Sequence, residues 1–419
     1  MGKGLKCLIL CALIVVTALS LQGCWDQQEV ERLGIVLATA MDQAPDGRVR
    51  LTVQVINPKV VAGGGRGGSA AGEPTIGSYR NISTEGSTIF DCIRRLSLEV
   101  PYELYFAHNM TLLISEELAK NRGIEEIIDF FERNPQIRRN NYILIARSDI
   151  SSILEMPGQI TLTPSQRIAG IIRHQRMSSY YPEIQLGDLL ELMETEGSAA
   201  YAAGIQVEPN EVDVRDKISG GWSSKEGRPK PIGTVIKVGG TAVFKGNKMA
   251  GWLDERESRG LLWVKGKAKG GAITVPCGSG NGSGEGPRLS LEIIRNGSKI
   301  EPELTEGELS VTVKVNVQAN ILEAECPEEL DKPEVIASIE QSLAAAVQGE
   351  VEAALSKAQK EYNTDVFGFG SAVHRKYPGI WKEIKENWMN VYPGLPVYLE
   401  VDANIPRTGL ITKPAQVRR

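Results

Sequence analysis

The chain has few histidines and no excess of basic residues. Only three histidines occur among 419 residues, which leaves little material for a catalytic or metal site built from imidazole groups. Lysine and arginine total 47 against 52 aspartate and glutamate residues, so the formal net charge is −5. A protein that binds nucleic acid usually carries a basic surface, and this charge balance therefore argues against a nucleic-acid partner.

Cysteines are few and form no recognisable motif. The chain has six, and no two are spaced as a CxxC pair. Three of them, Cys92, Cys277 and Cys326, follow residue 24, and they are odd in number and widely separated. Such spacing predicts no disulfide framework and no metal-binding motif, so we interpret all three as incidental.

Arrangements of catalytic residues are also lacking. No Ser/His/Asp or Cys/His constellation can be assembled from the sequence. Two clusters of carboxylates lie beside expected helix starts, where negative charge favours the helix dipole; they are Glu125/Glu126/Asp129 and Glu328/Glu329/Asp331. The sequence therefore predicts a protein that is not an enzyme and that holds no metal ion and no cofactor.

No stretch of the chain is apolar over the roughly 20 residues that a membrane-spanning helix needs. The N-terminus instead carries Lys3 and Lys6 without an acidic residue, followed by an uncharged apolar run at 7–20. A basic start before a short apolar run is the layout of a secretory signal, so we expect export by the Sec route.

The residues after this run are Leu21-Gln22-Gly23-Cys24. A small residue before a cysteine, just past an apolar run, is the lipobox pattern of bacterial lipoproteins. Cleavage would remove residues 1–23, with a diacylglyceryl group on the Cys24 sulfur and an acyl group on the freed amine. Two or more acyl chains give stable membrane anchoring. A plain signal peptide with an incidental cysteine and an uncleaved short anchor are the alternatives.

Composition divides the mature chain into two parts. Residues 208–231 are charged, contain several prolines and glycines and lack a periodic apolar pattern, so they are predicted to be a linker or long loop. An N-terminal region at 24–207, with up to two sheet-and-helix units, and a C-terminal α+β domain at 232–412 flank it. Gly-rich stretches at 62–74 and 277–287 are interpreted as surface loops, not as nucleotide-binding sites.

Hydrophobic periodicity predicts an α+β fold. Strands are expected at 34–41 and 48–56, joined by a hairpin turn at Asp46-Gly47. Strict alternation at 309–321 and 397–405 is typical of antiparallel strands with one buried face. A long amphipathic helix is expected from about 332 to 362. We therefore expect multi-domain layers of antiparallel or mixed β-sheet packed with helices.

The sequence resembles one known family along nearly the whole mature chain. Cys24-Trp25-Asp26 with Glu29 resembles the CWD-x-x-E start of the Ger(x)C spore germination lipoproteins, the C subunits of nutrient germinant receptors. Further similar stretches are Phe90–Leu154, which includes Ala107-His108-Asn109, Gly240–Leu253, Glu257–Trp263 and Asp365–Gly370.

This resemblance implies a fold and a function. The fold would be mixed α+β with three sheet-and-helix units. The protein would be attached to the outer face of the endospore inner membrane, in a complex with two polytopic receptor subunits, one of them transporter-like. The family's C subunit has no known catalytic activity. The sequence therefore predicts a non-catalytic, lipid-anchored subunit of a germinant receptor.

Two other functions remain as alternatives. A solute-binding lipoprotein of an ABC importer would also be tethered by cysteine. Such a protein has two doubly wound lobes with parallel sheets, and the alternation at 309–321 and 397–405 argues against them. A lipid-anchored cell-wall hydrolase would need paired carboxylates or a metal set, and the sequence indicates neither.

Few residues stand out as candidate contacts. His108, at an expected strand start, is a candidate partner contact or hydrogen-bonded switch, with a structural histidine as the alternative. Arg133, Arg138 and Arg139 form a small basic patch that could meet lipid headgroups or a partner, with a solvated face as the alternative. Four tryptophans are predicted to anchor the core: Trp252, Trp263, Trp381 and Trp388.

Overall fold

The computed structural model describes residues 32–57, 78–156, 161–209, 233–277, 287–326, 330 and 332–406, with a few positions before residue 14. Outside the described residues lie Cys24 and its lipobox, the loop at 62–74, nearly all of the loop at 277–287 and of the linker at 208–231, and the cluster Glu328/Glu329/Asp331. None of the helices formed by the described residues has the length and apolar character to cross a membrane.

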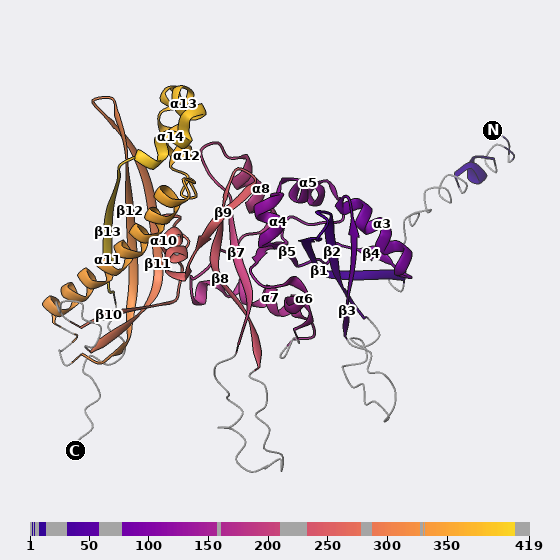
Figure 1. Cartoon of the computed structure of the whole chain (residues 1–419), viewed down its shortest axis with the longest axis horizontal. Coiled ribbons are helices and arrows are strands. Elements are labelled where there is room, and N and C mark those ends of the chain that lie inside the picture. The colour runs from indigo at the N-terminus through magenta and orange to yellow at the C-terminus, as the bar shows by residue number, and fades with distance from the viewer. Residues whose placement is uncertain are drawn as a thin grey trace, which may run out of the picture.

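Nine strands among the described residues form one large mixed sheet (Figure 1). Eight follow the order β3-β2-β1-β5-β6-β7-β8-β9, and β4 pairs with β1. The four central strands, β1, β5, β6 and β7, are parallel to one another, and the outer strands of this order are antiparallel to their neighbours. Their bounds are β1 Leu33–Gln43, β2 Val49–Ile56, β3 Tyr79–Gly86, β4 Glu103–Tyr105, β5 Thr111–Ser115, β6 Tyr142–Ala146, β7 Tyr201–Pro209, β8 Thr234–Lys245 and β9 Lys248–Leu253.

Helices cover both faces of this sheet. Successive residues of a strand point to opposite faces, and those of β5 and β6 are all buried, so both faces of these two strands are covered. Apolar side chains of α3, α4, α5 and α8 pack on one face, and those of α6 and α7 pack on the other. The helices are α3 Ile89–Glu99, α4 Glu116–Asn121, α5 Glu125–Arg133, α6 Ile150–Glu155, α7 Pro164–Arg173 and α8 Leu186–Glu194.

The predicted hairpin between β1 and β2 is confirmed. Gln43 lies opposite Val49, and the chain reverses at Gly47. Gly47 has a φ of 82°, in the left-handed region that glycine adopts without steric cost. The Asp-Gly pair at the tip of this hairpin therefore sets the pairing of the two strands.

Four further strands form a second sheet in the order β10-β11-β12-β13. The predicted long helix is confirmed as α11, Pro333–Leu355, which continues into a π-helical turn at Ser356–Glu361 and lies along the second sheet (Figure 1). α10, Glu255–Val264, packs against α11 and connects the two sheets along the chain. The strands are β10 Ala272–Pro276, β11 Arg288–Thr305, β12 Glu308–Ala324 and β13 Val397–Asn404.

The direction of the last strand differs from the prediction. β13 pairs parallel to β12, with Val311 opposite Val397 and Gln318 opposite Asn404. Alternation at 397–405 is typical of an antiparallel strand, but alternation reports only that one face of a strand is buried. Direction depends on the connection, and here α11 and three short helices carry the chain back to the other end of the sheet before β13 begins.

The three short helices between α11 and β13 form the helical cap, which we define as residues 365–395. They are α12 Phe369–Lys376, α13 Pro378–Ile384 and α14 Trp388–Val391. The cap stands at one end of α11 and β11 (Figure 1). Its aromatic side chains pack on one another: Trp381 contacts Trp388 edge to face, with ring centroids 5.4 Å apart. The cap therefore has its own small core.

The large sheet continues across the predicted linker. β7 ends at Pro209, β8 begins at Thr234, and these two residues are paired neighbours in the sheet. Residues on both sides of 208–231 therefore contribute to one sheet. The described strands form two sheets, whereas the resemblance implies three units; the division into 24–207 and 232–412 stays a prediction.

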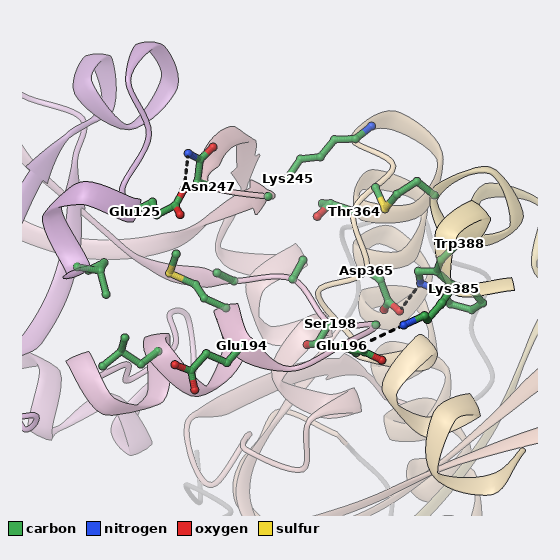
Figure 2. Close-up of a pocket in the computed structure, with 18 of the residues that line it drawn as sticks. Glu125, Glu194, Glu196, Ser198, Lys245, Asn247, Thr364, Asp365, Lys385 and Trp388 are labelled. Atoms are coloured by element: carbon green, nitrogen blue, oxygen red, sulfur yellow. Dashed lines mark hydrogen bonds and ion pairs between the residues drawn. The ribbon is translucent and has the colours of Figure 1, made fainter. Parts of the chain in front are cut away.

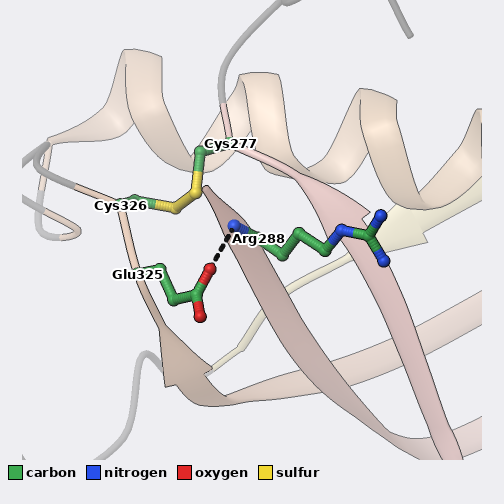
Figure 3. Close-up of a disulfide and its surroundings, with 4 residues drawn as sticks. All are labelled: Cys277, Arg288, Glu325 and Cys326. Atoms are coloured by element: carbon green, nitrogen blue, oxygen red, sulfur yellow. Dashed lines mark hydrogen bonds between the residues drawn. A yellow bond between two sulfur atoms is a disulfide. The ribbon is translucent and has the colours of Figure 1, made fainter. Parts of the chain in front are cut away.

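The interpretation of Cys277 and Cys326 as incidental was wrong. The two cysteines form a disulfide, with 5.6 Å between their Cα atoms (Figure 3). β10 and β12 both pair with β11, so the ends of these strands meet although 49 residues separate the cysteines. Sequence spacing carries no sign of this pairing, because β11 brings the strands together. Cys92 is a buried free thiol whose pKa is raised by burial.

Candidate functional site: the cleft between the large sheet and the helical cap

A cleft of about 730 Å³ opens between the large sheet and the helical cap (Figure 2). α5 and α8 form one wall, the turn between β8 and β9 forms the second, and the cap with residues 196–200 forms the third. These segments are distant in sequence, so the cleft forms only when the N-terminal and C-terminal parts of the chain have folded against each other.

The cleft combines apolar side chains with an acidic rim. The apolar contributions come from Ile128, Leu190, Met193, Trp381, Trp388 and Met389. The rim carries six glutamate or aspartate side chains and two lysines, namely Glu125, Asp129, Glu132, Glu194, Glu196, Glu386, Lys245 and Lys385. Several rim carboxylates are already paired; Glu125, for example, accepts a hydrogen bond from the amide of Asn247 at 3.2 Å.

Asp365 organises the wall of the cleft that the cap forms. Its carboxylate accepts hydrogen bonds from the backbone N–H groups of Gly368 at 2.8 Å, Phe369 at 3.0 Å and Gly370 at 2.8 Å, and from the Trp388 indole at 3.2 Å. The side chain is 3% exposed, and this burial raises its pKa. Because all four donors belong to the cap, Asp365 holds the start of α12 and the start of α14 together.

Close backbone contact joins the cap to the segment after α8. Gly197, at a φ of 71°, accepts a hydrogen bond from the Ser371 N–H at 2.9 Å. A Cβ at Gly197 would lie 2.5 Å from the Gly370 carbonyl carbon, so only glycine allows this approach. Thr364 adds a hydroxyl hydrogen bond of 2.5 Å to the Phe244 carbonyl of β8. The cap is therefore fastened to the segment between α8 and β7, and the residue just before the cap is fastened to β8.

Glu196 lies at the edge of the cleft with a set of partners from the cap. Its carboxylate accepts a hydrogen bond from the Trp381 indole at 3.0 Å and forms an ion pair with Lys385 at 3.5 Å, and the His374 Nδ1 atom lies 3.9 Å from it. The indole hydrogen bond and the Lys385 charge lower the pKa of Glu196. The group is half exposed, so these contacts position side chains more than they stabilise the fold.

A buried ion pair connects α10 to α11. Arg259 donates from Nε to Glu350 Oε2 at 2.8 Å and pairs through its terminal nitrogen with the other oxygen. Trp263 donates its indole N–H to the same carboxylate at 2.8 Å. Arg259 and Glu350 are 7% and 6% exposed. Gly260 lets the two helices touch, because a Cβ there would lie 2.1 Å from the Glu350 carbonyl oxygen.

The side chains that line the cleft suit recognition of another molecule. Asp365 and Glu196 are already committed to hydrogen bonds and ion pairs with the cap. Within the part of the chain that the structure describes, no group of three or more His, Cys, Asp or Glu side chains could hold a metal ion. An apolar interior with an acidic rim suits a protein segment or a cationic group.

Two family models match the chain, one on each side of the predicted linker. Residues 26–207 match the "Spore germination protein N-terminal domain", and residues 239–409 match the family "Spore germination B3/GerAC like, C-terminal". Spore germination protein KC of Bacillus subtilis is 30% identical over 98% of this chain and 97% of its own length. The chain belongs to the GerAC family of spore germination proteins.

More distant relatives support the same placement. Spore germination protein A3 of B. subtilis is 25% identical over 93% of this chain and 94% of its own length, and protein B3 is 23% identical over 94% and 96%. The crystal structure of the GerBC protein superposes with a TM-score of 0.53, at 17% identity, over 88% of this chain and 97% of that chain. The GerAC family chain therefore shares the α+β fold of GerBC.

None of the described candidate contact residues, His108 and the three arginines, lines the cleft. His108 is exposed, with its ring 5.9 Å from that of Tyr105, and it does not line the cleft. Arg133 pairs with Asp129 at 2.8 Å, and Arg139 pairs with Glu132. Both carboxylates line the cleft, so acidic partners offset part of the predicted basic patch.

Arg138, the third residue of this patch, is exposed, and Cys24 lies outside the described residues. The roles of all five candidate residues in this GerAC family chain stay predictions. For the tryptophans, burial of Trp263, Trp381 and Trp388 is confirmed at 0%, 2% and 4% exposure. Trp252 is half-buried, with the Arg147 guanidinium 3.9 Å from its ring centroid.

The sequence did not indicate the roles of two residues, Asp365 in the wall of the cleft and Glu350 in the core. Asp365 opens the stretch Asp365–Gly370, where a carboxylate precedes two glycines, and that pattern could have indicated an acceptor for backbone N–H groups. Glu350 offers no such signal, because a glutamate inside an amphipathic helix normally faces water.

Proposed function

We propose that this GerAC family chain is the lipid-anchored, non-catalytic subunit of a nutrient germinant receptor. It would act by assembling with two polytopic membrane subunits, one of them transporter-like, on the outer face of the spore inner membrane. The observation that carries the proposal is the presence of both germination domains in one chain that spans almost the full length of its germination relatives.

The disulfide supports the location outside the cytoplasm. Structural disulfides persist mainly in exported proteins, because the cytosol keeps thiols reduced. The bond between Cys277 and Cys326 is therefore the arrangement expected of a chain that crosses the membrane and folds beyond it. The lipobox at residues 21–24 supplies the proposed anchor, with acyl chains on Cys24.

The cleft supports a role in assembly more than in catalysis. Its cap wall is held by Asp365, whose carboxylate is fully occupied by four donors. A general base needs a free position toward substrate, which this carboxylate does not have. The fold also differs from the importer alternative, which requires two doubly wound lobes, whereas here one large mixed sheet is joined to a four-stranded sheet.

Deletion of the gene tests the proposal directly. Spores that lack the chain are expected to form normally and to lose germination with one set of nutrients, because one receptor type loses a subunit. Germination is followed by the fall in optical density after each nutrient is added. A copy of the wild-type gene should restore the response, and a Cys24→Ala copy should restore it only weakly. Unchanged germination with every nutrient would contradict the proposal.

A further inference from the structure

The exposed side of α3 carries large apolar side chains that solvent-facing helices seldom show. Leu98 is 87% exposed and Phe90 is 53% exposed. At 100° per residue, Phe90, Arg94, Ser97 and Leu98 lie within about 100° of one another around the helix axis. We call these four residues the α3 face. The buried side of the same helix, with Cys92 and Leu96, packs on the large sheet.

A groove runs beside the α3 face and enlarges the apolar surface. It has a volume of about 410 Å³ and lies between α3, α5 and the residues around β4. Phe90 and Ile93 line it from α3, and Phe106 and Phe130 line it from the other side. Arg94 lies over the Phe90 ring, 4.7 Å from its centroid, and Arg133 stands on the opposite rim. The surface thus joins aromatic side chains to guanidinium groups.

The chain enters the fold next to this surface. β1 begins at Leu33, which pairs with Glu103, and a Cβ at Gly34 would lie 3.3 Å from that of Tyr102. Tyr102 is 46% exposed and lies in the turn between α3 and β4. Leu33 is nine positions after Cys24 in the sequence, a reach of about 30 Å when extended. An anchor on Cys24 would therefore keep this end of the elongated body near the bilayer (Figure 1).

We propose that the α3 face rests on the lipid bilayer and orients the protein there. The inference rests on the proposed anchor at Cys24. Phe90 and Leu98 enter the headgroup region, Tyr102 lies at the interface, and Arg94 and Arg133 meet lipid phosphates. Acidic side chains also lie in this region. Asp91 pairs with Arg95, and Asp129 pairs with Arg133.

Further acidic groups, Glu99 and Glu103, are exposed beside the α3 face. The surface is therefore not strongly basic, and apolar insertion of the side chains is the main attraction to lipid. A bilayer of zwitterionic and anionic lipids should accept it with little dependence on salt, in contrast to a polybasic membrane patch.

Cysteine labelling tests the proposal in the lipidated full chain. Leu98→Cys places a polarity-sensitive dye on the α3 face, and Leu322→Cys places it on β12 as the matched control, because Leu322 is also a largely exposed leucine at 67%. Cys92 is buried, Cys277 and Cys326 form a disulfide, and the exposed Cys11 lies in the segment that the proposed cleavage removes, so the dye reacts at the introduced thiol. The proteins are reconstituted into vesicles of phosphatidylethanolamine and phosphatidylglycerol, with lipids brominated on the acyl chains as quenchers.

Quenching at position 98 is expected to exceed that at position 322 by about twofold or more, because only the first position enters the lipid. Equal quenching in protein that floats with the vesicles would overturn the α3 contact while leaving the anchor in place. Protein that does not float with the vesicles would overturn the anchor and, with it, this inference. A Leu98→Ser variant should float equally well, since the acyl chains hold it.

Discussion

Replacing Glu350 by alanine is expected to destabilise the protein by about 3–5 kcal/mol, because the Arg259 cation then stays buried without its carboxylate partner. Glu350 accepts hydrogen bonds from both Arg259 and the Trp263 indole, so the change also leaves an indole N–H unsatisfied. The three residues connect α10 to α11, and the loss should therefore loosen the junction between the two sheets.

Urea unfolding followed by tryptophan fluorescence measures this change. Glu352→Ala is the matched control, because Glu352 lies two residues further along the same helix and is exposed. The control should cost less than about 0.5 kcal/mol, as surface substitutions usually do. A double variant, Arg259→Ala with Glu350→Ala, should lose less than the sum of the single changes. A loss below about 1 kcal/mol for Glu350→Ala would contradict the account of the buried pair.

Removing the disulfide by Cys277→Ser and Cys326→Ser is expected to cost about 2–4 kcal/mol of unfolding free energy. The bond closes a segment with a sequence separation of 49 residues, and loop closure restricts the unfolded chain more than the folded one. The effect should appear as a lower urea midpoint, with the second sheet losing its connection between the ends of β10 and β12.

Reduction supplies the control for this prediction. Wild-type protein treated with dithiothreitol should unfold at the urea concentration of the double variant, and dithiothreitol should leave the variant unchanged. Under denaturing conditions without reductant, the chain from residue 32 onward should show one free thiol, at Cys92, because Cys277 and Cys326 are bonded to each other. Three free thiols, or equal stability of variant and oxidised wild type, would contradict the disulfide.

Local sequence patterns predicted much of the fold. Asp46-Gly47 correctly predicted the first hairpin, because the turn chemistry depends on neighbouring residues. The apolar stripe of α11 was predicted for the same reason, since its period is a property of the helix itself. The α+β class follows from these elements, and the fold of the GerAC family chain agrees with it.

Contacts between distant segments were harder to predict. The direction of β13 depends on where α11 and the helical cap return the chain, which alternation does not report. The pairing of Cys277 with Cys326 depends on β11, and the burial of Glu350 depends on α10 lying against α11. Each result follows from tertiary packing, so a single sequence without paired variation offers no local signal for it.

In the candidate site, too, local features were predicted and contacts between distant segments were not. Trp381 and Trp388 were predicted as buried anchors from residue type alone. The cleft that they help to form requires α5, α8 and the β8–β9 turn to lie against the helical cap. No sequence motif predicts that arrangement. Asp365 was part of a stretch that resembles the family, yet its four hydrogen bonds became visible only in the folded chain.

The central claim, a receptor subunit held among membrane proteins, is tested most directly by purification from spores. Inner membranes are solubilised in a mild detergent, the chain is captured through a C-terminal tag, and its partners are identified by mass spectrometry. The account predicts recovery of two polytopic membrane proteins, one of them transporter-like, and their absence from a mock capture with untagged spores. Recovery of an importer permease with its ATPase, or of no polytopic protein at all, would contradict it.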